Sequence, residues 1–145
     1  MNKKPKGEIM KDLQLLPYLT FDGTCREAME FYRQVFGGEL EVRYFKEFYG
    51  DMPQTDQEKV MHAELKNDAM SLMASDSVPG SETTFGDNVR ITVTGTDSKR
   101  LAAFFGELGQ GGTVFMPFEK QVWGQELGML TDKFGTHWLI SVRGE

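Results

Sequence analysis

One segment of this chain occurs twice, and the repeat constrains the fold more than any other feature of the sequence. Residues 24–38 return as 97–111, each copy with a capping residue first, an aromatic pair in the middle and glycine at the end. The apolar spacing within each copy predicts an amphipathic helix, and Thr24 with Glu27 is typical of a capping box. Two copies predict a duplicated unit whose seam is a natural place for a ligand cleft. The aligned residues are Thr24 with Asp97, Phe31-Tyr32 with Phe104-Phe105, and Gly38 with Gly111.

Alternating apolar and polar residues predict strands on both sides of each helix, so each half reads strand, helix, strand, strand, strand. We therefore expect a polar N-terminal tail over 1–12 and a single domain over 13–145. The domain would contain units 13–76 and 88–142, joined by a Ser-, Pro- and Gly-rich linker over 77–87. The expected strands are 13–21, 39–48, 59–66, 69–75, 89–94, 113–118, 125–131 and 136–142, and the expected helices are 25–36 and 98–108.

Length and charge bound the class of protein. A chain of 145 residues is one domain's worth, long enough to bury roughly 70% of its unfolded surface. Its single cysteine cannot pair within the chain, which indicates a reducing compartment, and we expect the cytoplasm. No apolar run predicts a membrane span or a secretory signal. A net charge of −6 argues against nucleic acid as a partner.

Several short motifs, in the right order along the chain, carry a family resemblance. They are Pro17-Tyr18-Leu19, residues 28–32 with 36–38, 61–65, 73–76, Trp123-Gly124 and 132–138. With them the chain resembles the vicinal oxygen chelate superfamily, the glyoxalase and bleomycin-resistance fold, and within it the PhnB-like branch, sometimes named for 3-demethylubiquinone methyltransferase. The resemblance implies an α+β fold in which two βαβββ units form curled mixed sheets around a shared cleft. It also implies a homodimer.

Catalytic members of this superfamily commonly hold a divalent metal with His, Gln or Glu side chains on the inner strands, which the resemblance places near 15–18, 71–74, 88–90 and Leu139. Hydrophobic or small residues stand at most of these positions, so we expect no metal or other cofactor at the usual site, although a divalent metal held elsewhere is possible. Methyltransferase activity is not expected, because no glycine-rich turn follows the first strand.

Three side chains are candidates for catalysis, or for an altered metal site if one exists. His62 and Glu64 share a strand face, which permits a proton relay or a metal pair; a hydrogen-bonded structural histidine is the alternative. His137 follows the last turn, near the expected mouth of the cleft, and its alternative is a satisfied turn residue.

Five further residues are candidates for ligand binding: Tyr18, Asp76, Arg90, Trp123 and Leu139. Asp76 and Arg90 would bind a charged group from the cleft rim, unless they form surface ion pairs. Trp123 would close over a flat ligand or pack in a dimer interface. Cys25 stands in a first helical turn, which can lower the pKa of a thiol, although an ordinary helix-start residue is the alternative.

Three functions are consistent with the sequence. The first is a small-molecule binding protein with an apolar cleft that works without a metal. The second is a metal-dependent lyase, isomerase or oxygenase using His62, Glu64 and His137. The third is a dimeric scaffold with a vestigial cleft. The substrate is not encoded in any feature of the chain, because function lives in the site rather than in the fold.

Overall fold

The computed structural model describes residues 12–144 and confirms two βαβββ units. All but the last residue of the predicted tail 1–12 lies outside the described residues. The elements of the first unit are β1 (Tyr18–Phe21), α2 (Cys25–Phe36), β2 (Glu39–Tyr44), η1 (Phe45–Glu47), α3 (Gln54–Gln57), β3 (Val60–Lys66) and β4 (Ser71–Asp76). Those of the second are β5 (Ile91–Gly95), α4 (Ser98–Leu108), β6 (Thr113–Lys120), β7 (Glu126–Thr131) and β8 (His137–Val142).

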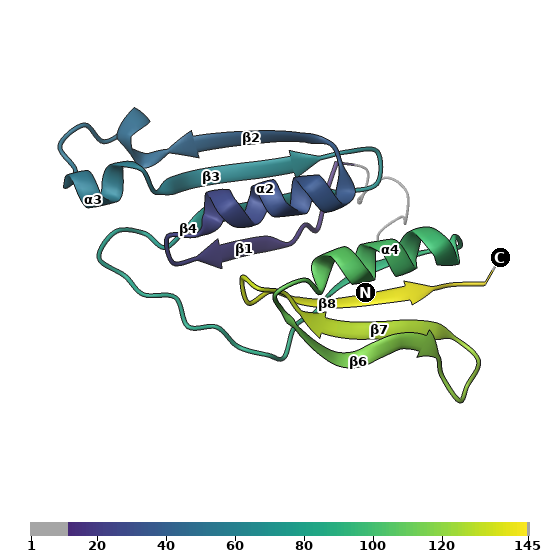
Figure 1. The fold of residues 1–145 in the computed structure, drawn as a ribbon. Coiled ribbons are helices and arrows are strands. Elements are labelled where there is room, and N and C mark those ends of the chain that lie inside the picture. The colour runs from purple at the N-terminus through teal and green to yellow at the C-terminus, as the bar shows by residue number, and fades with distance from the viewer. Residues whose placement is uncertain (1–11, 145) are drawn as a thin grey trace, which may run out of the picture.

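Each unit contains one four-stranded mixed sheet, with strand orders β1-β4-β3-β2 and β5-β8-β7-β6. The first strand of each unit is parallel to the last, and the other pairs are antiparallel. In Figure 1, α2 lies along one sheet and α4 along the other, and the two helices are neighbours where the units meet. The fold is the expected α+β class, and its sheets remain separate and open rather than closing into a barrel.

The core lies between each helix and its own sheet and continues across the seam. The apolar stripe of α2 is buried, and Tyr32 and Phe36 also reach the second unit. The Phe36 ring packs against Phe104 of α4, with centroids 5.1 Å apart, and against Trp138 of β8 at 5.5 Å. The Tyr32 ring also packs against Trp138, with centroids 5.4 Å apart. Aromatic residues of α2 and α4, Phe36 and one member of each repeated pair among them, therefore join the two units into one core.

The two helices start in different ways, although their sequences align. Asp97 caps α4 as expected, because its carboxylate accepts a hydrogen bond from the Arg100 N–H at 3.2 Å. The capping box predicted for α2 is wrong, since the Thr24 side chain makes no capping hydrogen bond. Asp76, at the end of β4, takes its place.

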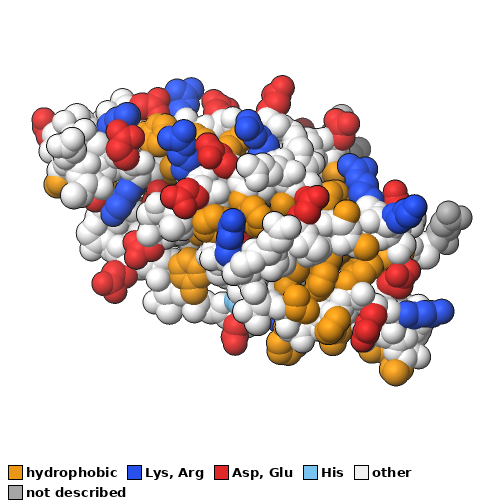
Figure 2. All heavy atoms as spheres, viewed as in Figure 1, with side chains coloured by type: hydrophobic (Ala, Val, Ile, Leu, Met, Phe, Trp, Pro, Cys, Tyr) orange, Lys and Arg blue, Asp and Glu red, His pale blue; other side chains and the backbone are white. Residues whose placement is uncertain are grey.

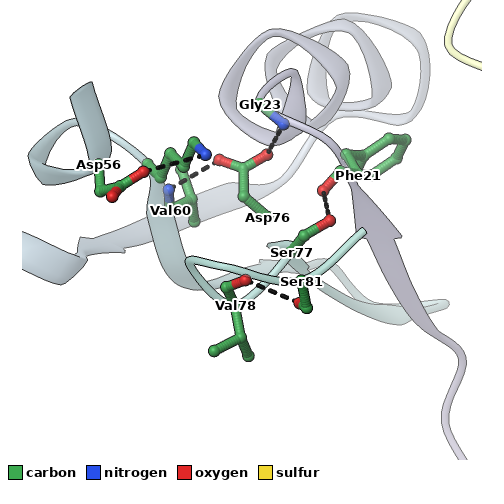
Figure 3. Close-up of polar contacts among 9 residues, drawn as sticks. Phe21, Gly23, Asp56, Val60, Asp76, Ser77, Val78 and Ser81 are labelled. Atoms are coloured by element: carbon green, nitrogen blue, oxygen red, sulfur yellow. Dashed lines mark hydrogen bonds and ion pairs between the residues drawn. The ribbon is translucent and has the colours of Figure 1, made fainter. Parts of the chain in front are cut away.

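Asp76 is only 3% exposed and points to the helix side of its sheet. Its Oδ1 accepts the N–H of Gly23 at 2.9 Å, and its Oδ2 accepts the N–H of Val60 at 2.8 Å (Figure 3). Oδ1 also accepts the N–H of Cys25, at 3.0 Å. The carboxylate thus joins the start of α2 to the start of β3, and the negative charge is favourable at the N-terminus of a helix.

A glycine after each helix allows the chain to pass close to the backbone of a neighbouring strand, where a side chain would not fit. At Gly38, φ is 113°, and a Cβ would collide with the carbonyl oxygen of Lys66. The corresponding collision in the second unit occurs at Gly112, against the carbonyl oxygen of Thr131. Gly112 rather than Gly111 is therefore the structural counterpart of Gly38, which corrects the sequence alignment of the repeat by one position.

Replacing Asp76 with alanine should leave three N–H groups without an acceptor. We expect the free energy of unfolding to fall by about 3 kcal/mol, since a buried unsatisfied donor costs about 1–3 kcal/mol. Thr24→Ala should change it by less than about 0.5 kcal/mol, and Asp97→Ala should lower it by about 1 kcal/mol. Urea unfolding followed by circular dichroism measures all three. Equal losses for Asp76→Ala and Thr24→Ala would contradict the assignment.

Candidate functional site

Each sheet has one face covered by its helix and one open face, and the strand alternation decides which residues reach the open face. On the first sheet, Tyr18, His62, Glu64 and Met73 share it, whereas Leu72 and Ala74 are buried toward α2. The expectation that His62 and Glu64 share a face is therefore confirmed. Their strand, β3, is separated from β1 by β4, so Met73 lies in register between Tyr18 and Glu64.

His62 and Glu64 have different partners on this face. The Tyr18 hydroxyl lies 3.3 Å from His62 Nδ1, with the ring centroids 5.8 Å apart. Glu64 accepts a hydrogen bond from the Ser71 hydroxyl at 2.9 Å and lies 3.8 Å from the Lys66 ammonium. A phenol beside an imidazole can exchange a proton with a ligand, so Tyr18 and His62 are the candidate acid–base pair of the open face.

Strand register identifies the inner positions that the resemblance assigns to metal ligands. Tyr18 pairs with Met73 in the first sheet, and Thr92 pairs with Leu139 in the second, at the matching place in the repeat. The fifth-strand position is therefore Thr92 rather than 88–90, which precede β5. A phenol, a thioether, a hydroxyl and an alkyl group are a poor set for a divalent cation. Within residues 12–144, no three His, Cys, Asp or Glu side chains gather closely enough to hold one.

A hollow runs along the junction of the two units, and we name it the seam groove. It consists of two adjoining cavities of about 500 and 390 Å³ that share Ala69, Met70, Val93 and Thr94. These four residues come from the β3–β4 turn and from β5, so the groove needs both units. The smaller cavity also contacts Leu16, Pro17, Ser71, Leu72, Ile91, Thr92 and Trp138. The larger extends to Phe36, Asn67, Asp68, Gly95, Thr96, Asp97, Arg100, Leu101, Phe104 and Arg143.

His137 is held by hydrogen bonds on both ring nitrogens. Nε2 lies 2.7 Å from the carbonyl oxygen of Gly86, and Nδ1 lies 2.7 Å from the Thr131 hydroxyl. A carbonyl oxygen only accepts, so Nε2 carries the proton and Nδ1 accepts from Thr131. His137 therefore fastens the connection between the units to β8, and this supports the alternative of a satisfied turn residue over a catalytic base.

The predicted ligand-binding residues do not form one cluster. The Asp76 carboxylate accepts three backbone N–H groups on the helix side of the sheet, which argues against a role in ligand binding. The Arg90 guanidinium lies 5.3 Å from the Phe115 ring centroid, and its buried Nη1 has no hydrogen-bond partner among the described residues. Trp123 is 62% exposed in the loop after β6, at the far edge of the second sheet from β5. Only Tyr18 and Leu139 occupy the inner register positions.

Two arginines that the sequence did not single out face the groove. Arg100 stands in the first turn of α4, and Arg143 directly follows β8. Neither belongs to a motif. The Arg143 N–H bonds to the Gly95 carbonyl oxygen at the end of β5, and both arginines line the larger cavity. A basic residue just after the last strand was the one available signal.

The architecture defines the class of protein. Paired βαβββ units with these strand orders place the chain in the vicinal oxygen chelate superfamily, in its PhnB-like branch, as expected. Other solved structures with this fold, described as glyoxalase-related or as glyoxalase/bleomycin resistance proteins, are 14 to 16% identical to it and show the fold alone.

More specifically, the chain belongs to the family described as 3-demethylubiquinone-9 3-methyltransferase, whose model matches residues 13–141. It is similar to protein PA1353 from Pseudomonas aeruginosa, with 33% identity, 92% of this chain and 100% of that chain covered, and a TM-score of 0.82. The PhnB protein from Bacillus cereus is 24% identical, with 90% and 100% covered and a TM-score of 0.74. Protein YjdN of Escherichia coli K12 is 26% identical over 90% of this chain and 95% of its own.

Cys25 is not an activated thiol. It is fully buried, and burial, followed by the charge of Asp76, raises its pKa well above the ordinary value. The pKa of Tyr32 is also raised, first by burial and then by the charge of Asp132. Cys25 is therefore unsuited to act as a nucleophile, because a reactive cysteine needs an exposed and electropositive setting.

Stability should consequently fall in alkali. Above about pH 9 the unfolded thiol ionises while the folded one stays protonated, so the native state is progressively disfavoured as pH rises. Between pH 8 and pH 10 we expect the free energy of unfolding of the natural chain to fall about 1 kcal/mol further than that of Cys25→Ala. Denaturant unfolding at pH 8, 9 and 10 tests this. Parallel pH profiles for the two proteins would contradict it.

Proposed function

We propose that this protein binds a small molecule in the seam groove and that it does so without a metal. The observation that carries the proposal is the groove itself, a preformed and largely apolar hollow that both units are needed to build. Its size is in the range of small-molecule sites, and its position between two packed units is typical of them. The open-face pair of Tyr18 and His62 is a separate feature that lies outside the groove lining.

Ala69 offers a direct test, because it lines both cavities and its side chain is exposed at a turn. Ala69→Trp should fill the groove and weaken binding of 1-octanol and 3-phenyl-1-propanol at least tenfold, measured by ligand-observed NMR titration. Ala102→Trp places the same bulk on an exposed position of α4 outside the groove and should leave both affinities unchanged. If both variants bind the alcohols as tightly as the natural chain does, or if neither the alcohols nor the carboxylic acids of the same skeletons bind the natural chain, the groove is not the site.

An enzyme with an altered metal site is the second candidate, favoured by one observation. Tyr18, His62 and Glu64 share an open face, so these side chains could supply oxygen and nitrogen ligands after small movements. His137 would not join them while both its nitrogens are engaged elsewhere. Such a metal would act as a Lewis acid toward two adjacent ligand oxygens.

This second candidate predicts that zinc, nickel or manganese raises the melting temperature, and that His62→Ala removes the effect while His137→Ala does not. Differential scanning calorimetry with and without each metal measures it. The seam-groove proposal expects no metal-dependent shift in any of the three proteins, so one experiment separates the two functions.

Methyl transfer is not part of the proposal. The turn from β1 to α2 is short, and Asp76 occupies the N–H groups of Gly23 and Cys25. That helix end therefore already holds a carboxylate and is closed to a cofactor phosphate or carboxylate.

We also propose a cytoplasmic homodimer. Figure 2 shows hydrophobic side chains gathered over the second unit, and Val114, Phe115, Val122 and Trp123 are among the large exposed apolar residues there. Such a surface is typical of an interface. The described residues include no helix long and apolar enough to cross a membrane.

A further inference from the structure

We propose that the ligand of the seam groove is an amphipathic anion, whose carboxylate or similar head binds Arg100 and Arg143 and whose apolar body lies along the groove. This inference rests on the proposed function, since it names the class of molecule that the groove would take. It depends on how charge and apolar surface are distributed along the hollow.

Two arginines from different elements, Arg100 and Arg143, are among the residues that line the larger cavity of the groove. Arg100 belongs to α4, and Arg143 is fixed beside the end of β5 by its N–H bond to the Gly95 carbonyl oxygen at 2.8 Å. Two planar groups with several N–H donors each suit a carboxylate, phosphate or sulfonate, which accepts paired hydrogen bonds from arginine.

Neither guanidinium is neutralised within the described part of the chain. Ion pairs there use other basic side chains, such as Arg26 with Glu30 and Arg43 with Glu47, and none includes Arg100 or Arg143. Arg100 instead lies over the Phe104 ring, 5.5 Å from its centroid. The charge therefore rests at the edge of an apolar surface, with donors left to meet an incoming anion.

Two acidic residues also line the larger cavity, and neither contacts the arginine side chains. Asp97 is committed to the helix cap through the Arg100 N–H. Asp68 is exposed in the β3–β4 turn. An anionic head placed between the two guanidinium groups would gain hydrogen bonds, whereas an ammonium head would find one capping carboxylate and one solvated one.

The remainder of the groove suits an apolar body. The larger cavity, which holds the arginines, is also lined by the apolar residues Phe36, Leu101 and Phe104. Met70 and Val93 line both cavities and so extend the apolar surface into the smaller one. That cavity ends among Leu16, Pro17 and Trp138, where no charged side chain contributes. A head-and-tail molecule of the size of octanoate or 3-phenylpropanoate matches this sequence of surfaces.

The test compares each acid with the alcohol of the same skeleton. Octanoate and 3-phenylpropanoate should bind about tenfold or more tightly than 1-octanol and 3-phenyl-1-propanol, measured by calorimetry or NMR titration at low salt. In the double variant Arg100→Gln, Arg143→Gln this preference should disappear, with the alcohols bound as before. The matched control, Arg33→Gln with Lys99→Gln, removes the same net charge outside the groove and should keep the preference.

The outcomes separate the two proposals. Equal affinity for acid and alcohol, or an acid preference that survives in the arginine double variant, would overturn the anionic head while leaving the groove as a binding site. Failure of both acids and alcohols to bind would sink the proposed function as well. Circular dichroism and melting temperature confirm that the variants fold, and Ala69→Trp should abolish binding of acids and alcohols alike.

Discussion

The buried carboxylate of Asp132 is the interaction on which the joined structure depends. It accepts hydrogen bonds from the Tyr32 hydroxyl at 2.6 Å, from Trp138 Nε1 at 2.8 Å, and from the N–H groups of Phe134 and Thr136. Tyr32 belongs to α2, whereas the other donors belong to the second unit. An acid that is 3% exposed needs several donors to replace water, and here one of them comes from the opposite half. Close packing of the units therefore completes the hydrogen bonds of the carboxylate, and the carboxylate in turn fixes the position of one unit against the other.

The turn before the last strand of each unit is stabilised by one polar side chain, but the residue and its partners differ between the units. Asn67, between β3 and β4, donates from its side-chain amide to the carbonyl oxygens of Phe36 and Gly37 and so closes the C-terminus of α2. Its Oδ1 also accepts two N–H groups of its own turn. Asp132, between β7 and β8, shapes its turn in the same way but sends its second oxygen across the seam. The two units share the turn conformation, but Asn67 bonds within its own unit whereas Asp132 bonds to Tyr32 of the other unit. This difference makes the domain asymmetric.

Much of the architecture was predictable because it is local or periodic. The repeat and the strand alternation predicted α2, α4, all eight strands and the shared face of His62 and Glu64. They did not predict the short helices η1 and α3, which lie in segments expected to be strand and loop. The errors arose where a distant residue replaces a local one. Thr24 has the side chain of a capping residue, but Asp76, at the end of β4, accepts the N–H groups at the start of α2 and Thr24 makes no capping hydrogen bond. The same contact occupies the carboxylate of Asp76, which was also a candidate for ligand binding. One tertiary interaction therefore explains the wrong cap and argues against a ligand at Asp76.

The candidate site was less predictable because its parts lie far apart in sequence and carry no motif. Met70 and Val93 line the same cavities only because a turn of one unit approaches a strand of the other. Arg143 and Arg100, 43 positions apart in the sequence, line the larger cavity together. The inner register positions carry Tyr18, Met73, Thr92 and Leu139. The family resemblance located three of them, but the fifth-strand position, Thr92, became clear only from the strand pairing. Such side chains can form hydrogen bonds and apolar contacts but are poor metal ligands. The residues that line the seam groove offer the same two kinds of interaction. The placement of charge follows a similar logic: the buried carboxylates of Asp76 and Asp132 accept hydrogen bonds from within the protein, whereas Arg100 and Arg143, which form no ion pair within residues 12–144, line the hollow between the units.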